Sequence, residues 1–284
     1  MRTLITGGEG QLGEDLAPLF AREGDTDAPD IDRLDVTDRD AVIEYLRHNR
    51  PDVVIHAAAM TDVDGCEKNE DLAFRINAEG SRHIAEACLE TGARLVMVST
   101  DFVFRGDTDR PYREDDEPVP LSAYGRSKLA GERAVQGLLP GAAVARTAWL
   151  YGEWGRGNFV RSILTAAEAG RTLRVVNDQF GSPTFSADAA AAIFGLVRRR
   201  GAGIFHIVNR GEASRYEFAR AALDLAGHKR TRIQPVSTAE YPLPAPRPAR
   251  STLAETRLEA LGVPPLRPWR EALADFIGRI ATPA

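Results

Sequence analysis

Short apolar runs alternate with amphipathic stretches through the first half of the chain. Four runs have the length and continuity of buried strands, at positions 3–6, 53–56, 95–98 and 142–146. Apolar residues at helical spacing occupy 12–22, a long stretch before position 95, and about 122–135. Strands and helices that alternate in this way form a parallel sheet with helices on both faces. The pattern predicts an α/β fold with a doubly wound parallel sheet.

One strand of this sheet has an unfavourable sequence. Residues 25–32, where a strand is expected after the first helix, are polar and are interrupted by Pro29. A buried central strand should be apolar and free of proline, which has no N–H to donate to a neighbouring strand. We therefore predict a short, irregular element there.

The second half of the chain has a different character. Prolines are concentrated at 235–248 and 264–268, which is typical of extended loops between small elements. An apolar run at 204–208 predicts one more strand. Helices are expected at 214–226, capped by Ser214, and at 269–280.

The composition is that of a globular chain. The 284 residues are 43% hydrophobic and carry 41 acidic and 36 basic side chains, a net charge of −5. This charge disfavours a nucleic-acid partner, because phosphates require a basic surface. We find no signal peptide and no apolar stretch of about 20 residues that would span a bilayer. With only Cys66 and Cys88, we expect reduced thiols in a cytoplasmic protein without membrane contact.

A glycine-rich turn follows the first predicted strand and opens the first predicted helix. Gly8, Gly10 and Gly13 fit G-x-G-x-x-G, and Gly7, Gly10 and Gly13 fit G-x-x-G-x-x-G. Positions without side chains let the backbone approach a pyrophosphate, whose charge is held at the helix N-terminus. This strand–turn–helix context predicts a Rossmann-like dinucleotide-binding domain, with an ordinary glycine-rich turn as the alternative.

The domain division follows from this turn and from the change in character of the second half. We expect residues 1–150 to form the dinucleotide-binding domain, to which 185–210 return. Residues 151–184 and 211–284 are then expected to form a smaller C-terminal α/β part that binds the substrate.

Two further segments are candidates for contact with a dinucleotide. An acid about 20 residues after the glycines normally binds the adenosine ribose, and the spacing does not distinguish the candidates Asp30, Asp32 and Asp35. Arg33 among these acids leaves the choice between NADH and NADPH open, because an arginine attracts a ribose 2′-phosphate. The small residues Ala57, Ala58 and Ala59 suit a backbone that lies against a flat cofactor, and a plain strand exit explains them equally well.

Tyr124 and Lys128 are the strongest candidates for acid–base chemistry. They lie four residues apart and therefore on one face of a helix. A tyrosine normally titrates near 10, and an adjacent cation lowers this value toward the neutral range. The chain holds 6 tyrosines and only three lysines, so chance predicts about 0.06 such pairs. A purely structural pair is the alternative.

The strand at 95–98 leads directly into Ser99 and Thr100. Loops at the carboxyl ends of parallel strands bind ligands in such sheets. A hydroxyl there would donate a second hydrogen bond to a substrate carbonyl beside the tyrosine. A local turn capped by the hydroxyl is the alternative.

Together these motifs resemble the extended short-chain dehydrogenase/reductases, and among them the dTDP-4-dehydrorhamnose reductases. The resemblance covers nearly the whole chain to about Asp188. The segments that carry it are 6–13, 34–38, 50–55, 99–104, 111–116, 124–128, 146–152 and 177–184.

This resemblance implies NAD(P)H-dependent reduction of the C4 keto group of a dTDP-4-keto-6-deoxyhexose. Tyr124 would protonate the C4 oxygen, Lys128 would lower the tyrosine pKa and hold the nicotinamide ribose, and Thr100 would bond the same carbonyl. Trp149 would pack against the deoxysugar ring in a pocket lined by Thr61 and Val63. The implied cofactor contacts are Gly7, Gly10, Gln11, Leu12, Gly13, Asp30, Asp35, Val36, Ala57, Ala58, Ala59, Tyr124 and Lys128.

The chain departs from the family pattern at two positions. Phe102 stands where the branch usually has tyrosine, which should affect packing more than catalysis. The related 4,6-dehydratases use a glutamate after the aspartate at this point of the motif, and Phe102 replaces it, so a dehydratase is disfavoured. Some members dimerise through a magnesium ion. Here Asp15 matches one ligand but Ala187 replaces another, so we expect no metal site.

Several alternatives stay open. A 4-epimerase would use the same residues, and a non-catalytic regulatory subunit, like that of methionine adenosyltransferase, shares the fold. The sequence does not determine the exact sugar, the C4 stereochemistry, or whether the protein is a monomer or a homodimer.

Overall fold

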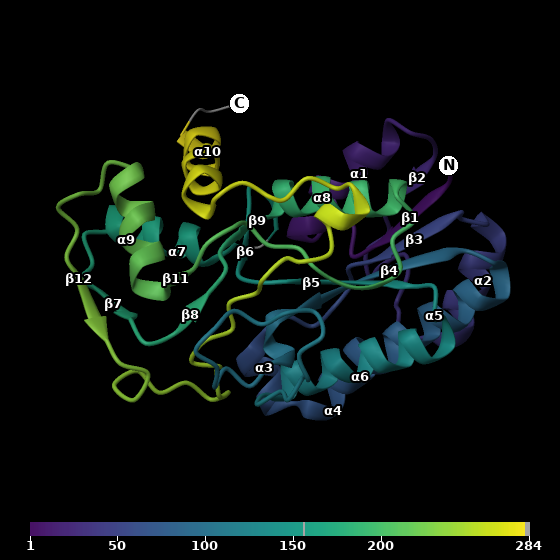
Figure 1. The fold of residues 1–284 in the computed structure, drawn as a ribbon, viewed down its shortest axis with the longest axis horizontal. Helices are drawn as coiled ribbons and strands as arrows, with labels where there is room; N and C mark the ends of the chain where they lie inside the picture. Colours follow the sequence, from purple (N-terminus) through teal and green to yellow (C-terminus); the bar gives the residue numbers. More distant parts are fainter. Residues whose placement is uncertain (156, 282–284) are drawn as a thin grey trace.

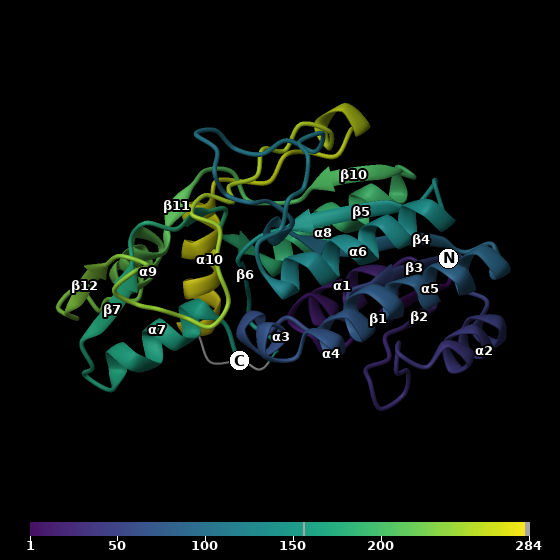
Figure 2. The same cartoon turned by 90° about the horizontal axis from the view of Figure 1, so that it is seen from below.

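A six-stranded parallel sheet forms the centre of the computed structural model, which describes residues 1–155 and 157–281. The strand order is β10-β5-β4-β3-β1-β2, and Figure 2 shows the strands in this order. Their bounds are β1 (Thr3–Thr6), β2 (Thr26–Asp27), β3 (Val53–His56), β4 (Arg94–Thr100), β5 (Ala143–Thr147) and β10 (Gly203–His206).

Helices cover both faces of this sheet (Figure 1). One face packs against α1 (Gln11–Ala21) and α8 (Ser186–Arg198), and the other packs against α2 (Arg39–Asn49), α5 (Gly80–Thr91) and α6 (Ala123–Leu138). Successive residues of a strand point to opposite faces, so Val53 and Ile55 of β3 join one core and Val54 joins the other. Strands buried on both faces read as continuous apolar runs. The predicted doubly wound α/β fold is confirmed.

The weak strand is as short as its sequence predicted. β2 holds only two residues in register, Thr26 opposite Thr3 and Asp27 opposite Leu4. Beyond it the chain runs beside the glycine-rich turn, where the Gly8 N–H donates to the Pro29 carbonyl at 3.1 Å.

Short helices lie between β3 and β5 beside α6. They are α3 (Val63–Lys68), α4 (Glu70–Phe74), a π-helical turn (Arg75–Glu79) and a 3₁₀ turn (Asp101–Val103). The polar residues of the first three hid them from a search for apolar periodicity. A second 3₁₀ turn (Glu259–Leu261) lies in the proline-rich part of the chain.

A smaller lobe is formed by the remaining elements, on the left of Figure 1. Its own core is built around Tyr151, Phe185, Phe218 and Phe276. Its elements are β6 (Leu150–Tyr151), α7 (Phe159–Glu168), β7 (Leu173–Val176), β8 (Phe180–Gly181), β9 (Thr184–Phe185), β11 (Ala213–Ser214), α9 (Arg215–Leu225), β12 (Ile233–Val236) and α10 (Trp269–Ala281). We call this part the small lobe and the rest the sheet lobe.

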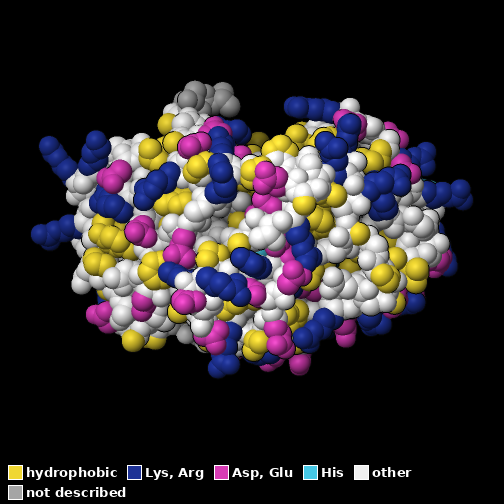
Figure 3. All heavy atoms as spheres, viewed as in Figure 1, with side chains coloured by type: hydrophobic (Ala, Val, Ile, Leu, Met, Phe, Trp, Pro, Cys, Tyr) yellow, Lys and Arg dark blue, Asp and Glu magenta, His cyan; other side chains and the backbone are white. Residues whose placement is uncertain are grey.

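The predicted domain bounds stay a proposal. The return of β10 to the central sheet and of α8 to the face of α1 supports the part assigned to 185–210. The last positions of the predicted substrate-binding part, 282–284, lie outside the described residues. Over the described part of the chain, no helix combines the length and apolar character needed to cross a membrane. Figure 3 shows basic and acidic side chains interspersed over one face of the molecule.

Candidate active site

The glycine-rich turn packs so closely that side chains are excluded from it. Gly7 has a φ of +71°, and a Cβ there would lie 2.9 Å from the backbone of Ala58. A Cβ on Gly13 would lie 2.3 Å from the carbonyl oxygen of Gly7, to which the Gly10 N–H donates at 3.1 Å. Gly10 precedes α1 and offers no side-chain cap to the N–H groups of its first turn. The turn therefore fits a dinucleotide pyrophosphate, which would accept from those N–H groups.

Asp30 lies against this turn. Its Oδ2 accepts from the Glu9 N–H at 3.1 Å. The Asp35 carboxylate is instead turned toward Thr37, whose N–H and hydroxyl donate to it at 2.9 and 2.8 Å. Arg33 is engaged by Asp27 at 2.9 Å. The geometry thus supports Asp30 as the ribose-binding acid.

Other predicted cofactor contacts differ in what they can offer. Leu12 and Val36 are buried in the two cores of the sheet lobe, so only their backbones are available to a ligand. The Gln11 side chain accepts from Asn158 at 3.1 Å and links α1 to the small lobe. The Ala57 N–H and the Ala58 N–H donate to the carbonyl and hydroxyl of Thr6, at 3.2 and 3.3 Å, which holds residues 57–59 beside the turn.

A buried chain of hydrogen bonds, not predicted from the sequence, starts at His56. Its Nδ1 pairs with the Thr6 hydroxyl at 2.8 Å and its Nε2 with the Ser81 hydroxyl at 3.1 Å. Ser81 donates its proton to the Asn77 carbonyl at 2.6 Å. Ser81 must therefore accept from His56 Nε2–H, and Thr6 donates to Nδ1.

Asn77 extends this chain to the helix that carries Tyr124. Its amide nitrogen donates to the Ser127 hydroxyl at 3.0 Å, and Ser127 donates to the Tyr124 carbonyl at 2.9 Å. The Asn77 oxygen also accepts from the Met60 N–H at 2.8 Å. The loop after β3, the glycine-rich turn and α6 are thereby fixed relative to one another.

Acid is expected to destabilise the fold through His56. Burial lowers the pKa of His56 to about 3, and the charge of Lys128 acts in the same direction, against an ordinary value of 6.5. Below pH 6.5 the unfolded chain therefore binds a proton that the folded protein does not, and the free energy of unfolding falls as the pH decreases toward 3. At pH 5 this amounts to about 2 kcal/mol. Urea unfolding at pH 7 and pH 5 should show a smaller decrease in His56→Gln, and an unchanged decrease would contradict the assignment.

The predicted catalytic residues meet at the carboxyl edge of the sheet. Tyr124 is only 9% exposed and its ring packs edge-on against Phe102, with centroids 5.7 Å apart. Its hydroxyl lies close enough to the side chain of Thr100, at the end of β4, for the two groups to interact. Lys128, on the next turn of α6, donates to the Val98 carbonyl at 2.8 Å.

The titration of this group differs from the sequence-based expectation. Burial raises the pKa of Tyr124 above its ordinary value, and the neighbouring Thr100 only partly offsets the effect. Burial also lowers the pKa of Lys128 to about 8, against the opposing charge of Glu132. The expected fall in the tyrosine pKa is therefore not observed. That expectation came from helical spacing, which does not show how completely Tyr124 and Lys128 are buried.

Asp101 is a second buried acid that the sequence reasoning did not single out. Its carboxylate accepts from Thr100 at 3.1 Å and from Ser251, in the chain that returns from the small lobe, at 2.5 Å. Burial raises the pKa of Asp101 to about 6. These bonds orient the Thr100 hydroxyl. They also connect Asp101 to Ser251, which lies 150 positions later in the chain.

The predicted substrate-binding residues differ in their exposure and in their contacts with the catalytic group. Val63 packs with the cluster that contains Tyr124, whereas Thr61 is exposed. Trp149 lies two residues beyond Thr147, which is the register partner of Thr100. Its backbone is left-handed, with a φ of 46°, and the guanidinium of Arg215 lies 3.5 Å from its ring centroid. Nothing in the sequence pattern pointed to Arg215.

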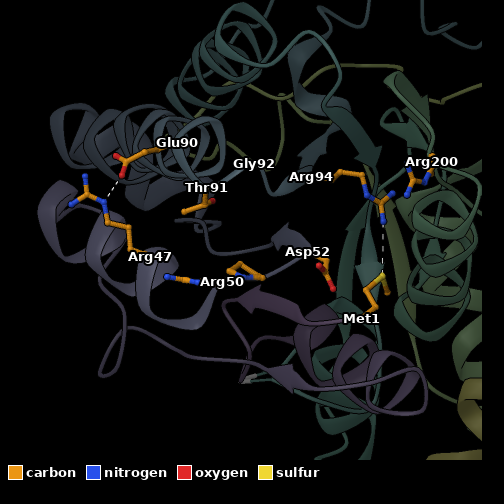
Figure 4. Close-up of a pocket in the computed structure, with 10 residues that line it drawn as sticks. Met1, Arg47, Arg50, Asp52, Glu90, Thr91, Gly92, Arg94 and Arg200 are labelled. Atoms are coloured by element: carbon orange, nitrogen blue, oxygen red, sulfur yellow. Dashed lines mark hydrogen bonds and ion pairs between the residues drawn. The ribbon is translucent and has the colours of Figure 1, made fainter.

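A cavity lies at the amino-terminal edge of the sheet, opposite the edge that carries the catalytic residues (Figure 4). This cavity of about 970 Å³ contains none of the predicted site residues. Charged side chains are prominent in its lining, which includes Met1, Arg47, Arg50, Asp52, Glu90, Arg94 and Arg200. Ligands of open parallel sheets bind at the carboxyl ends of the strands. Within the described ranges, no three His, Cys, Asp or Glu side chains are arranged to hold a metal ion.

A doubly wound fold with a glycine-rich turn and a Thr–Tyr–Lys group at the carboxyl edge defines a short-chain dehydrogenase/reductase of the extended type. A family model described as the RmlD substrate binding domain matches residues 1–282, and the chain belongs to this family.

Three relatives show how close this relationship is. The dTDP-4-dehydrorhamnose reductase of Mycobacterium tuberculosis (strain CDC 1551 / Oshkosh) is 45% identical, over 97% of this chain and 92% of its own length. A probable dTDP-4,6-dihydroxy-2-methyloxan-3-one 4-ketoreductase of Streptomyces antibioticus is 44% identical, over 97% and 94%. The crystal structure of Bacillus anthracis dTDP-4-dehydrorhamnose reductase in complex with NADP superposes with a TM-score of 0.95, at 39% identity and 99% coverage of both chains.

Proposed function

We propose that this protein uses NADPH or NADH to reduce the C4 keto group of a dTDP-4-keto-6-deoxyhexose, with dTDP-4-dehydro-L-rhamnose as substrate and dTDP-L-rhamnose as product. The observation that carries this proposal is the pairing of the Tyr124 phenol with the Thr100 hydroxyl beside the glycine-rich turn, in a chain 45% identical to a dTDP-4-dehydrorhamnose reductase.

The cofactor would be held by the turn formed by Gly7, Gly10 and Gly13 and by Asp30, with Ala57, Ala58 and Ala59 against its flat part. The reduced nicotinamide supplies a hydride to C4. Lys128, which faces the same edge from α6, would donate to the ribose hydroxyls next to the ring. Its burial in a low-dielectric site strengthens such a bond.

Tyr124 and Thr100 would act on the ketone oxygen. Thr100 is oriented by its bond to Asp101 and can donate to a carbonyl when it releases that acceptor. The Tyr124 phenol would then pass its proton to the oxygen as negative charge develops on it. Val63 and Thr61 would line the pocket of the sugar, with Trp149 at its edge.

The proton for this step is available on Tyr124. Burial keeps the pKa of Tyr124 above its ordinary value, so the side chain carries its proton at neutral pH. A 4-epimerase would use the same residue, and the two activities are separated by the assay below.

The decisive assay is the oxidation of NADPH or NADH, followed by absorbance, with dTDP-4-dehydro-L-rhamnose and its stereoisomers. We expect stoichiometric consumption of the reduced cofactor. Tightly held cofactor with no net consumption would indicate an epimerase. A folded, cofactor-binding protein that turns over none of these sugars would refute the proposal and favour a regulatory subunit.

The finer features of the protein are also proposals. Cys66 and Cys88 are both free and buried, which supports a reducing, cytoplasmic location. We propose a monomer or a homodimer that binds a nucleotide sugar and neither nucleic acid nor membrane.

A further inference from the structure

Arg215 forms a close stack with Trp149 at the boundary between the two lobes. It is the first residue of α9, and its guanidinium carbon lies 3.5 Å from the indole centroid. The indole is held in turn by the small residue Gly181, where a Cβ would approach the ring to 2.4 Å. Stacking through its flat face leaves the edge of a guanidinium, with its five N–H donors, free to bind a ligand.

These donors make no contact with an acceptor in residues 1–155 and 157–281. Among the residues that the structure describes, the Arg215 guanidinium has no hydrogen-bond or ion-pair partner. Two charged neighbours act on it, Asp101 and Arg247. Arg247 is neutralised by Asp64 through two bonds of 2.9 Å, and the Asp101 carboxylate is occupied by Ser251 and Thr100. Within the described part of the chain, Arg215 is therefore a cation at this boundary without a bound counter-charge.

The position of Arg215 relates it to the reacting groups. Trp149 follows β5 at the edge where Thr100 ends β4, and the guanidinium of Arg215 is near enough to Asp101, the neighbour of Thr100, for the two charges to interact. A nucleotide sugar carries a diphosphate on C1, a few bonds from the C4 ketone. Arginine is suited to phosphate because its planar fork donates two parallel hydrogen bonds.

We propose that Arg215, held flat on Trp149, binds the diphosphate of the nucleotide-sugar substrate. This inference rests on the proposed function. It gives Trp149 the role of a platform for the guanidinium, in place of the sugar-stacking role that the family resemblance implies.

The test compares ligands with and without the diphosphate. Thymidine and dTDP are titrated as competitive inhibitors of wild type, Arg215→Met and Arg215→Lys. We expect Arg215→Met to weaken dTDP by about 10- to 100-fold and to leave thymidine unchanged. Arg215→Lys should restore part of the dTDP affinity because it keeps the charge but not the fork. The dissociation constant of NADPH should not change.

Arg270→Met is the matched control. Arg270 is exposed and stacks on Trp269 at 4.3 Å in the same lobe, so its loss removes the same charge and the same kind of contact. We expect it to bind both ligands like wild type. If Arg215→Met weakened the binding of dTDP and thymidine equally, or weakened neither, the inference would be overturned. Turnover of the nucleotide sugar by wild type would leave the proposed function standing in that case. Selective loss of dTDP in a protein that reduces no nucleotide sugar would support the anion site and refute the function.

Discussion

Tyr124→Phe is expected to lower kcat by about 10²- to 10⁴-fold, the usual contribution of a positioned acid. The variant keeps the aromatic ring that packs against Phe102 and removes only the hydroxyl beside Thr100. The glycine-rich turn and Asp30 are not touched. The dissociation constant of NADPH, measured by fluorescence titration, should therefore stay close to that of wild type while the steady-state rate collapses.

Tyr112→Phe provides a matched control for this experiment. Tyr112 is 8% exposed, stacks on Phe104 with centroids 4.2 Å apart, and its hydroxyl accepts from the Gly106 N–H at 2.8 Å. Its replacement removes a buried phenol and a hydrogen bond away from Thr100, so kcat should change little. Comparable losses in both variants would mean that the defect is one of folding, and full activity of Tyr124→Phe would show that another group supplies the proton.

The parts of this site that were predicted from the sequence are those that depend on neighbours along the chain. The glycine-rich turn requires a close approach between residues a few positions apart, and Tyr124 and Lys128 share one helix face because of helical spacing. The irregular β2 was predicted for the same reason, from Pro29 and the polar residues around it. Each of these features is encoded within one short segment.

The parts that were not predicted depend on contacts between distant segments. Asp101 meets Ser251 across 150 residues, and Arg215 meets Trp149 only because the small lobe folds back onto the end of β5. The rise in the pKa of Tyr124 also arises from tertiary burial. β12 was missed because it contains Pro235 and belongs to a sheet of two strands, where a proline is tolerated and alternation is weak.

Arg146→Leu is expected to destabilise the protein by about 3–5 kcal/mol, because it leaves a buried carboxylate without its partner. Arg146 of β5 and Glu132 of α6 form an ion pair at 2.7 Å whose side chains are 2% and 1% exposed. Ser99 donates to the same carboxylate at 2.5 Å. This pairing gives Arg146 a structural role.

Urea unfolding of Arg146→Leu, Glu132→Leu and the double variant would distinguish the stabilisation by the ion pair from the cost of burying one charge without its partner. The double variant should be more stable than Arg146→Leu, since no charge is then left buried. Arg39→Leu breaks an exposed pair with Glu86 and should cost less than about 1 kcal/mol. A similarly small cost for Arg146→Leu would contradict the assignment.

Because the charge of Glu132 raises the pKa of Lys128, Glu132→Leu should in addition shift the titration of Lys128 downward. The pair thus connects the stability of the sheet lobe to the charge beside Tyr124, and the pH dependence of kcat in a folded Glu132→Leu variant would measure that connection directly.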